Sequence, residues 1–273
     1  MAGEEYSIIS FVNLKGGVGK TALSVNFAAY CGSEGYKTLL IDLDPQTNAT
    51  FSCMPIDKWE DHAKKRGTVA NLLGVRNHTS VDAFGKKAAD VIVKSVFSGV
   101  DLIPSHLDLF TVDLDMGAEV ARETRLRRAL KDLISKYDII VCDCPPNLTI
   151  PTQNALAMST DYVIPVSPDY LSSIGIGLLK NRVEKLSVDL ENKINLAGIV
   201  MSRVGRPSFF RSQTKQTLRT TFGDLIFDTE ITERSSVSEA AAKNRSIYGM
   251  SDASAISEFR AMSDELLIKL GWK

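Results

Sequence analysis

The stretch NLKGGVGKTALS, residues 13–24, decides the fold, because it sets a glycine-rich loop between an apolar run and a helix-like segment. Its glycines leave backbone N–H groups open to curl around phosphate oxygens, and the helix that follows adds the positive end of its dipole. The general phosphate-loop pattern, Gly, four residues, then Gly-Lys-Ser/Thr, requires a glycine at position 14. Leu14 stands there instead, and Lys15 precedes the usual lysine, Lys20. The stretch therefore predicts a phosphate-binding loop that carries two lysines.

Short apolar runs alternate with helix-period segments along nearly the whole chain, which is typical of a parallel sheet covered by helices on both faces. Strands are expected at 7–13, 37–43, 100–104, 137–143, 161–167, 196–202 and 224–231. Helices are expected at 20–33, 117–136, 152–159, 173–188, 208–221 and 252–270. The expected fold is α/β, with a mostly parallel, twisted sheet of about seven strands, of the P-loop NTPase kind. Residues 52–99 have weak periodicity and predict a surface excursion of short helices, so we expect a single domain over 1–273.

Composition places the chain among ordinary globular proteins. It has 273 residues, 44% hydrophobic and 24% charged, with a formal net charge of -1 that gives no global sign of nucleic-acid or membrane binding. The N-terminal MAGEEYSIIS carries acids where a secretory signal has bases, and no apolar run approaches 18 residues, so a cytoplasmic protein is expected. The four cysteines match no zinc spacing and are expected to be buried, reduced thiols.

Acidic residues stand at the ends of two expected strands. Asp42 and Asp44 lie at the end of 37–43, and Asp143 ends 137–143. Alternation along a strand puts Asp42 and Asp44 on the same side, so both can face the crevice at the carboxyl edge of the sheet. Lys20 is expected to reach the β- and γ-phosphates of a nucleotide, and the Thr21 hydroxyl to ligate Mg²⁺. The sequence thus predicts a Mg²⁺-nucleotide site whose metal-facing residues are Thr21, Asp42 and Asp143.

Three motifs together resemble a known family. KGGVGKT (15–21), DLDPQTNAT (42–50) and YDIIVCDCPPNLT (137–149) are similar to the deviant Walker A, switch I and switch II segments of the ParA/Soj partition ATPases, in the wider group that includes MinD. The likeness continues through GVDLIPSHLDL (99–109) and, more weakly, through 230–250. Two positions depart from the family: Thr47 replaces a glycine of switch I, and Cys-Pro-Pro-Asn replaces Ala-Pro-Pro-Ser in switch II.

The resemblance implies a weak, partner-stimulated ATPase that uses ATP and Mg²⁺ and forms a homodimer sandwiching two ATP molecules. In that arrangement Lys15 reaches the phosphates bound by the other subunit, Asp44 positions the attacking water, and Asp143 holds Mg²⁺ through water. The implied catalytic residues are Lys15, Lys20 and Asp44, and the implied nucleotide-binding residues are Lys15, Gly16, Gly17, Val18, Gly19, Lys20, Thr21 and Ala22. Base contacts are expected near MSRVG (201–205) and ITERSS (231–236).

A run of cations suggests a surface for non-specific DNA. The residues that compose it are Arg203, Arg206, Arg211, Lys215 and Arg219, with Lys243 and Arg245 as extensions. If 208–221 is helical, the last three of the main run recur every four residues and form one basic stripe. With a ParB-like activator as partner, this surface predicts a nucleoid-associated protein that partitions plasmid or chromosomal DNA.

Other functions remain open at the level of sequence. The same ATPase could position a protein organelle or chemoreceptor cluster, because the partner chooses the cargo. A MinD-like membrane protein would need a basic amphipathic helix at the C-terminus, but 252–270 mixes acids into its polar side and is expected to pack on the domain, with no membrane partner. A metal-cluster ATPase would need bridging cysteines, and Cys142 and Cys144 form no Cys-x-x-Cys.

Overall fold

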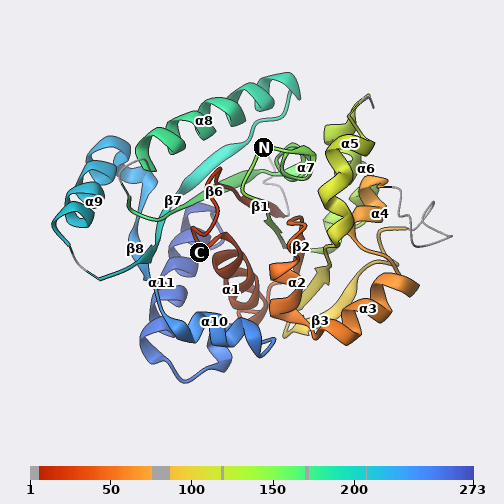
Figure 1. The fold of residues 1–273 in the computed structure, drawn as a ribbon, viewed down its shortest axis with the longest axis horizontal. Helices are drawn as coiled ribbons and strands as arrows, with labels where there is room; N and C mark the ends of the chain where they lie inside the picture. Colours follow the sequence, from red (N-terminus) through yellow and green to blue (C-terminus); the bar gives the residue numbers. More distant parts are fainter. Residues whose placement is uncertain (1–5, 76–86, 118–119, 170–171, 207) are drawn as a thin grey trace.

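A computed structural model of the chain describes residues 6–75, 87–117, 120–169, 172–206 and 208–273. These residues form an eight-stranded sheet with the order β3-β4-β2-β5-β1-β6-β7-β8 (Figure 1). The strands are β1 (Ser7–Phe11), β2 (Thr38–Asp42), β3 (Val93–Phe97), β4 (Val100–Ile103), β5 (Ile139–Asp143), β6 (Asp161–Val166), β7 (Asn195–Val204) and β8 (Ile226–Thr232). Neighbouring strands are parallel except β3 and β4. The predicted α/β class with a mostly parallel sheet is confirmed.

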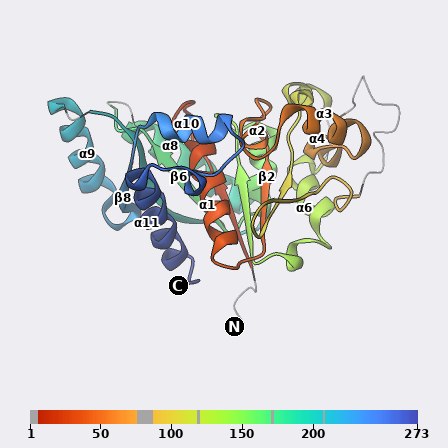
Figure 2. The same cartoon turned by 90° about the horizontal axis from the view of Figure 1, so that it is seen from below.

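Helices cover both faces of this sheet, as Figures 1 and 2 show: α1 and α11 lie over one face, and α6, α7 and α8 lie over the other. The helices are α1 (Lys20–Ser33), α2 (Asn48–Cys53), α3 (Ile56–Lys65), α4 (Val69–Leu73), α5 (Val112–Asp115), α6 (Arg125–Leu130), α7 (Ile150–Met158), α8 (Ser172–Asp189), α9 (Phe209–Phe222), α10 (Ser235–Ala242) and α11 (Ala253–Lys269). In the described part of the chain, no helix combines the length and apolarity needed to cross a bilayer.

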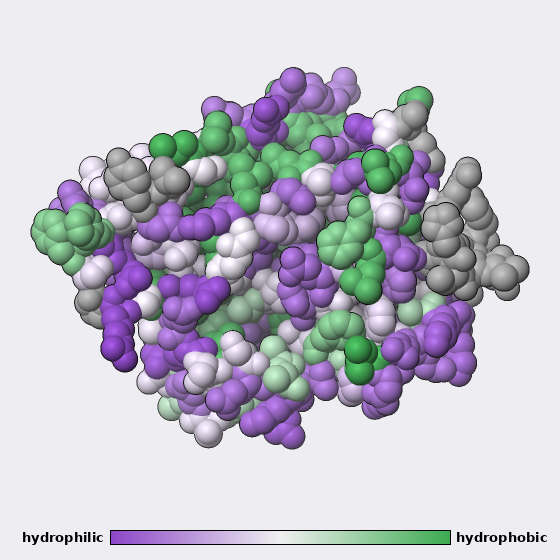
Figure 3. Space-filling model, in the orientation of Figure 1, coloured by the Kyte–Doolittle hydropathy of each residue, from purple (hydrophilic) through white to green (hydrophobic). Residues whose placement is uncertain are grey.

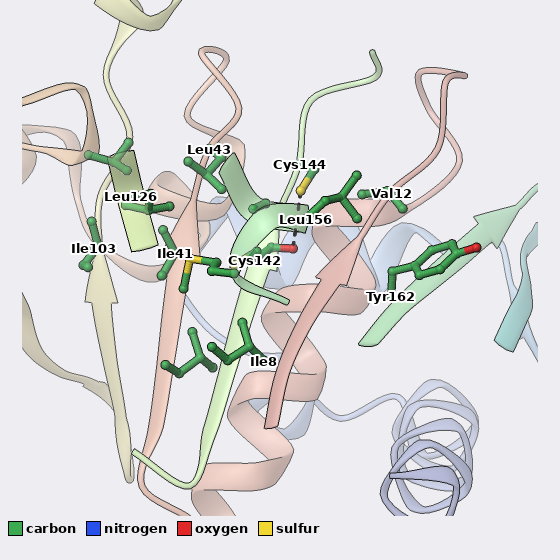
Figure 4. Packing of buried hydrophobic residues seen from close by; sticks show 14 of the residues in the cluster. Ile8, Val12, Ile41, Leu43, Ile103, Leu126, Cys142, Cys144, Leu156 and Tyr162 are labelled. Atoms are coloured by element: carbon green, nitrogen blue, oxygen red, sulfur yellow. Dashed lines mark hydrogen bonds between the residues drawn. The ribbon is translucent and has the colours of Figure 1, made fainter. Parts of the chain in front are cut away.

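The core is split in two by the sheet. Ile8 and Val12 belong to the cluster under α7 and α8, whereas Ile9 and Phe11 belong to the cluster under α1 and α11. Figure 4 shows the first cluster, with Ile8 and Val12 on the same side of the sheet as Leu156. Successive side chains of a strand point to opposite faces, so a strand covered on both faces reads as a continuous apolar run. This is why the central strands are recognisable in the sequence.

One predicted helix is broken in the structure. The segment expected as a helix over 117–136 contains a 3₁₀ turn at Arg122–Thr124, the short α6, and another 3₁₀ turn at Ile134–Lys136. The Asn154 side chain on α7 accepts from the Leu126 N–H at 3.0 Å and donates to the Arg122 carbonyl at 2.9 Å. These contacts with a distant helix take up backbone groups that a continuous helix would use internally, so tertiary structure overrides the local periodicity.

The stretch expected as a surface excursion over 52–99 contains part of α2, the helices α3 and α4, and a strand that sequence periodicity does not indicate. This strand, β3, is an edge strand, half-exposed, and its register with β4 is interrupted between Val93 and Phe97. Short, partly polar edge strands are a common way to blunt the edge of a sheet, and they leave little apolar alternation to read. Residues 76–86 of the excursion and the N-terminal residues 1–5 lie outside the described residues.

Other expectations about packing are confirmed. In α11 the apolar side chains Phe259, Met262 and Leu266 are buried against the sheet and α1, as expected for a helix that packs on the domain. All four cysteines are buried and free. Burial raises the pKa of the Cys142 thiol to about 12, which keeps it protonated at neutral pH.

Candidate functional site

The loop between β1 and α1 has backbone conformations that require its glycines. Gly17 and Gly19 adopt φ angles of 72° and 83°, in the left-handed region that other residues avoid. The loop runs directly into α1, whose first residue is Lys20. Backbone N–H groups at the start of this 14-residue helix have no partner within the helix and add a partial positive charge. The loop therefore has the geometry of an anion site.

Lys20 lies beneath the loop and is 6% exposed. Its Nζ donates to the carbonyls of Asn13 at 3.3 Å and Lys15 at 3.1 Å. Burial lowers the pKa of this ammonium, while the nearby carboxyls of Asp143 and Asp44 raise it. A cation held by two carbonyls at the inner wall of the loop is positioned to meet phosphate oxygens in the same space.

Asp143 supplies a buried carboxyl beside the start of α1. Thr21 Oγ1 donates to Asp143 Oδ2 at 2.8 Å, whereas Asp143 Oδ1 is buried and has no hydrogen-bond partner among the described residues. Burial raises the pKa of Asp143 to about 7, and the hydrogen bond from Thr21 opposes the rise. An unsatisfied buried carboxylate oxygen next to a threonine hydroxyl fits a hard divalent cation, for which oxygen ligands are preferred.

No three Asp, Glu, His or Cys side chains converge into a metal-binding group within the described ranges. This arrangement suits Mg²⁺, which is usually held by one or two carboxylates together with waters and substrate phosphates instead of an all-protein cage. The residues that fit the ion are Thr21 and Asp143.

Asp42 lies in a different environment from the one expected. Its Oδ1 accepts from the Asp44 N–H at 3.1 Å, and its Oδ2 accepts from the N–H and hydroxyl of Thr50 at 2.8 and 2.7 Å. The side chain is fully buried, and burial together with the Asp143 carboxyl raises its pKa well above the ordinary value. The Asp44 N–H occupies one oxygen and Thr50 of α2 occupies the other, so Asp42 organises the loop after β2 and is not among the residues that line the cavity. The expectation that it contacts the metal is therefore corrected.

Asp44 does line the site. Its Oδ1 accepts from the Gln46 N–H at 2.9 Å, and its carbonyl accepts from the Ser105 hydroxyl at 2.6 Å. Burial raises the pKa of this carboxyl, and Lys20 opposes the rise. Thr47, three residues after Asp44, adopts a φ of 56°, in the left-handed region. Glycine adopts this conformation most readily, which explains why a glycine suits this position in the family that the motif resembles. Hydrogen bonds from the Thr47 N–H and hydroxyl to neighbouring carbonyls hold that conformation.

A cavity of about 950 Å³ opens above the loop. Its walls come from the phosphate loop and start of α1, the segment after β2 including Asp44, the end of β7, and the connection from β8 into α10. Figure 2 shows α2 and α10 at the same edge of the sheet as the start of α1. Ser202, Arg203 and residues 231–234 line the wall, so both segments expected to contact the base meet at this cavity. Its size suits a nucleotide.

Lys15 has different surroundings from Lys20. Its side chain is 61% exposed and forms an ion pair with Asp169, in the connection between β6 and α8. Asp169 also accepts from the Ser172 hydroxyl at 3.0 Å. Sequence reasoning missed Asp169, because this residue lies far from the loop motifs along the chain and has no motif of its own.

The expected basic stripe on α9 is partly neutralised. Lys215 Nζ lies 2.5 Å from Glu230 Oε2, and Arg219 Nη2 lies 3.1 Å from Glu230 Oε1. Glu230 is on β8, so a scan of 203–219 for acids could not reveal it. Arg211 instead donates to the backbone carbonyl of Arg206, a neutral acceptor that does not cancel the charge of the guanidinium. The positive charge of α9 is therefore concentrated at its N-terminal end.

Exposed aromatic side chains accompany those cations. Phe209 and Phe210 are 77% and 78% exposed, and an apolar patch is visible over α9 at the left of Figure 3. Arg206 precedes them and is exposed. Aromatic faces beside arginines are typical of surfaces that contact nucleic acid, although other partners use the same chemistry.

Three further cations of the predicted surface lie elsewhere. Arg203 and Arg245 line the cavity, and Lys243 lies 4.0 Å from Glu239 on α10. Arg203 donates to the Gly17 carbonyl at 2.8 Å and pairs with Glu233. Sequence spacing grouped Arg203 with the α9 cations, but the parallel sheet brings the end of β7 next to the phosphate loop, which corrects that grouping.

Comparisons with known proteins agree with this geometry. A family model described as an AAA domain matches residues 6–196. The cell division protein PomZ of Myxococcus xanthus is 33% identical over 263 residues, covering 95% of this chain and 77% of that protein. The sporulation initiation inhibitor protein Soj of Bacillus subtilis is 32% identical over 240 residues, covering 88% of this chain and 89% of that protein.

A solved structure shares the fold. A putative plasmid partition protein of Borrelia burgdorferi B31 bound to AMPPNP has a TM-score of 0.78 and 23% identity, covering 97% of this chain and 99% of that one. The chain belongs to the ParA/Soj family of P-loop ATPases.

Proposed function

We propose that this chain is a Mg²⁺-ATP-dependent, dimerising ATPase that binds DNA non-specifically and partitions plasmid or chromosomal DNA with a separate ParB-like activator. The observation that carries the proposal is the different placement of the two loop lysines. Lys20 is buried at the phosphate loop, whereas Lys15 extends to the surface of the same loop. A lysine outside the core of the loop suits phosphates bound by a second copy, which makes its charge conditional on dimerisation.

The chemistry is the transfer of the γ-phosphoryl group of ATP to water, which yields ADP and phosphate. The Asp44 carboxylate accepts a hydrogen bond from the attacking water, and the buried Lys20 neutralises charge on the β- and γ-phosphates. The loop N–H groups and the start of α1 hold the phosphates in line. Thr21 and Asp143 would hold Mg²⁺, which when bound would neutralise charge at the phosphate oxygens. Lys15 of the second copy completes the positive charge.

Support for ATP and for DNA partition comes from different sources. The cavity over the loop has room for a nucleotide, and the Borrelia neighbour carries AMPPNP. Exposed cations and aromatics at the start of α9 offer a footing for phosphate backbone, doubled in a dimer. We place the protein in the cytoplasm, on the nucleoid, as one domain spanning 1–273.

In a second candidate function, the same ATPase positions a cargo other than DNA. Because the partner chooses the cargo, a protein cargo positioned on the nucleoid is the main alternative to DNA, and the relative PomZ is itself named a cell division protein. A partner captured by the ATP-bound dimer separates the two: a ParB-like DNA-binding protein supports partition, and a component of a protein assembly supports the alternative.

The proposal is tested with Asp44→Ala, which removes the water-orienting carboxylate and leaves the phosphate loop intact. We expect this variant to bind ATP, to accumulate as a dimer by light scattering, and to retain DNA at low salt without turnover. Lys20→Ala is the matched control and should remain monomeric in ATP. Asp44→Ala protein that stays monomeric at saturating ATP would contradict the sandwich dimer.

A further inference from the structure

The end of β7 ties down the phosphate loop from outside. Ser202 Oγ donates to the Val18 carbonyl at 2.5 Å, and Arg203 Nη1 donates to the Gly17 carbonyl at 2.8 Å. A trans peptide carries its N–H opposite to its C=O. Fixing the carbonyls of Gly17 and Val18 therefore fixes the directions of the N–H groups of Val18 and Gly19, which belong to the same two peptides. These N–H groups are among the donors that a phosphate-binding loop needs.

Arg203 also binds the segment that follows β8. Its Nε donates to Glu233 Oε1 at 3.0 Å, and its Nη2 donates to the same oxygen. Glu233 directly follows β8, and its N–H donates to the Val204 carbonyl at 3.1 Å. The guanidinium thus joins the phosphate loop to the connection between β8 and α10, and both Arg203 and Glu233 line the cavity.

The backbone of Arg203 is held in an unusual conformation. Its φ is 51°, in the left-handed region, which is unfavourable for a non-glycine residue and persists where the surroundings impose it. The side chain is about half exposed, at 48%, but its charge is already engaged by a carboxylate and a carbonyl. A strained, doubly engaged arginine at the wall of a cavity fits a positioning role better than a surface contact with DNA.

We propose that Arg203 is a positioning residue for the nucleoside triphosphate: with Glu233 it forms a latch that holds the phosphate loop against the wall that faces the base. The latch rests on the proposed nucleotide function and deepens it. Arg203 acts through the Gly17 carbonyl, and its fork of donors lets it hold Gly17 and Glu233 at once. Lysine has a single point charge and cannot hold both with the same geometry.

The test is calorimetric titration of the full chain with AMPPNP and Mg²⁺. We expect Arg203→Gln to weaken binding about tenfold, the effect of losing a hydrogen bond from a charged group. Arg203→Lys should restore little of it, and Glu233→Gln should weaken binding in the same direction. Because the two residues act together, the double variant should lose less than the sum of the single losses.

Arg206→Gln is the matched control, since it removes the same charge three residues away from an exposed position. It should bind AMPPNP like the wild type. Arg203→Gln, once saturated with nucleotide, should retain DNA at low salt like the wild type. Its KM for ATP should rise with the weaker AMPPNP binding and by a larger factor than its kcat falls, a split that a general loss of structure would not give. Thermal unfolding without nucleotide checks that each variant is folded.

Two outcomes would overturn the latch. One is Arg203→Gln protein that binds AMPPNP as tightly as the wild type. The other is a variant that keeps its nucleotide affinity and loses DNA retention, which would return Arg203 to the DNA surface. Lys20→Ala, titrated alongside, keeps this failure apart from failure of the proposed function. If Lys20→Ala binds AMPPNP as the wild type does, or if neither Lys20→Ala nor the wild type binds it, the proposed nucleotide site is wrong. If Lys20→Ala loses binding and Arg203→Gln keeps it, only the latch is wrong.

Discussion

Lys15 and Asp169, 154 residues apart in the chain, form an ion pair at the surface of the phosphate loop. The lysine is mostly exposed, so water screens the pair, and such exposed ion pairs contribute at most about 1 kcal/mol to stability. A contact this weak can be exchanged for a phosphate oxygen when one comes within reach. In the proposed dimer, Lys15 must leave Asp169 before it can meet the nucleotide of the second copy.

Asp169→Asn should therefore favour the dimer. Removing the carboxylate releases Lys15, and we expect the concentration of half-dimerisation in ATP to fall by up to about fivefold, the equivalent of one exposed ion pair. The measurement is analytical ultracentrifugation of both proteins in the Asp44→Ala background, in which we expect no turnover. In a Lys15→Ala background the same substitution should have no effect. An equal gain there would mean that Asp169 acts on something other than Lys15.

The two lysines of the loop should separate binding from turnover. Lys20→Ala removes a buried cation from the phosphate loop, and we expect nucleotide affinity to fall roughly 100-fold. Lys15→Ala should keep the affinity of the monomer and lower hydrolysis about 100-fold, because its charge matters in the transition state of the dimer. Calorimetry gives the affinity, and phosphate release gives the rate. Equal losses of affinity at both positions would make Lys15 a local ligand.

Local motifs and the rule of parallel sheets were enough to predict the centre of the site. Lys20 and Thr21 follow the loop, and Asp143 ends an apolar strand. In the structure Asp143 is paired in register with Phe11 of β1 and with Asp42 of β2. The carboxyl ends of parallel neighbours meet at one edge, so these groups converge wherever the strand order makes them neighbours. That much follows from sequence.

What sequence could not predict are contacts between segments that carry no shared pattern. Glu230 neutralises α9 from β8, and Arg203 reaches the phosphate loop from the end of β7. Asp42 alternates with Asp44 as expected, yet Thr50 on α2 captures its carboxylate. Each of these partners is chosen by how strands and helices lie in space. A charge run therefore gives candidate cations, but which of them remain available depends on acids elsewhere in the chain.

Glu230→Gln should strengthen DNA retention. The substitution removes the carboxylate that pairs with Lys215 and Arg219 and so releases cation charge on α9. We expect tighter binding of non-specific duplex and a dependence on log salt that is steeper by about one unit. Fluorescence anisotropy of the ATP-bound protein across a salt series measures both. Glu60→Gln makes the same charge change on α3, far from α9 in Figure 1, and should alter binding little. If both variants gain equally, net charge alone controls DNA retention.

The nucleotide-free protein should lose stability as pH rises from about 4 to about 7 through its buried carboxyls. The pKa of Asp143 is about 7 in the folded chain, against an ordinary value of 3.8, because burial disfavours the charged form. In that window the folded state holds a proton that the unfolded state has released, so the free energy of unfolding falls with rising pH. The contribution of this carboxyl is at most about 4 kcal/mol.

Asp143→Asn tests this effect, because the amide does not titrate. The substitution also removes the Asp143 charge that raises the pKa of Asp42, and this change acts in the same direction. The difference in free energy of unfolding between variant and wild type should shift in favour of the variant between pH 4 and 7, and then level off. Urea unfolding at intervals of pH, without nucleotide or Mg²⁺, measures both curves. Groups such as His62, whose pKa burial lowers, contribute to both proteins and cancel in the difference. If the free energies of unfolding of the two proteins ran parallel with pH, Asp143 would already be ionised in the folded protein near pH 4. A positively charged group other than Mg²⁺ would then have to stabilise its carboxylate.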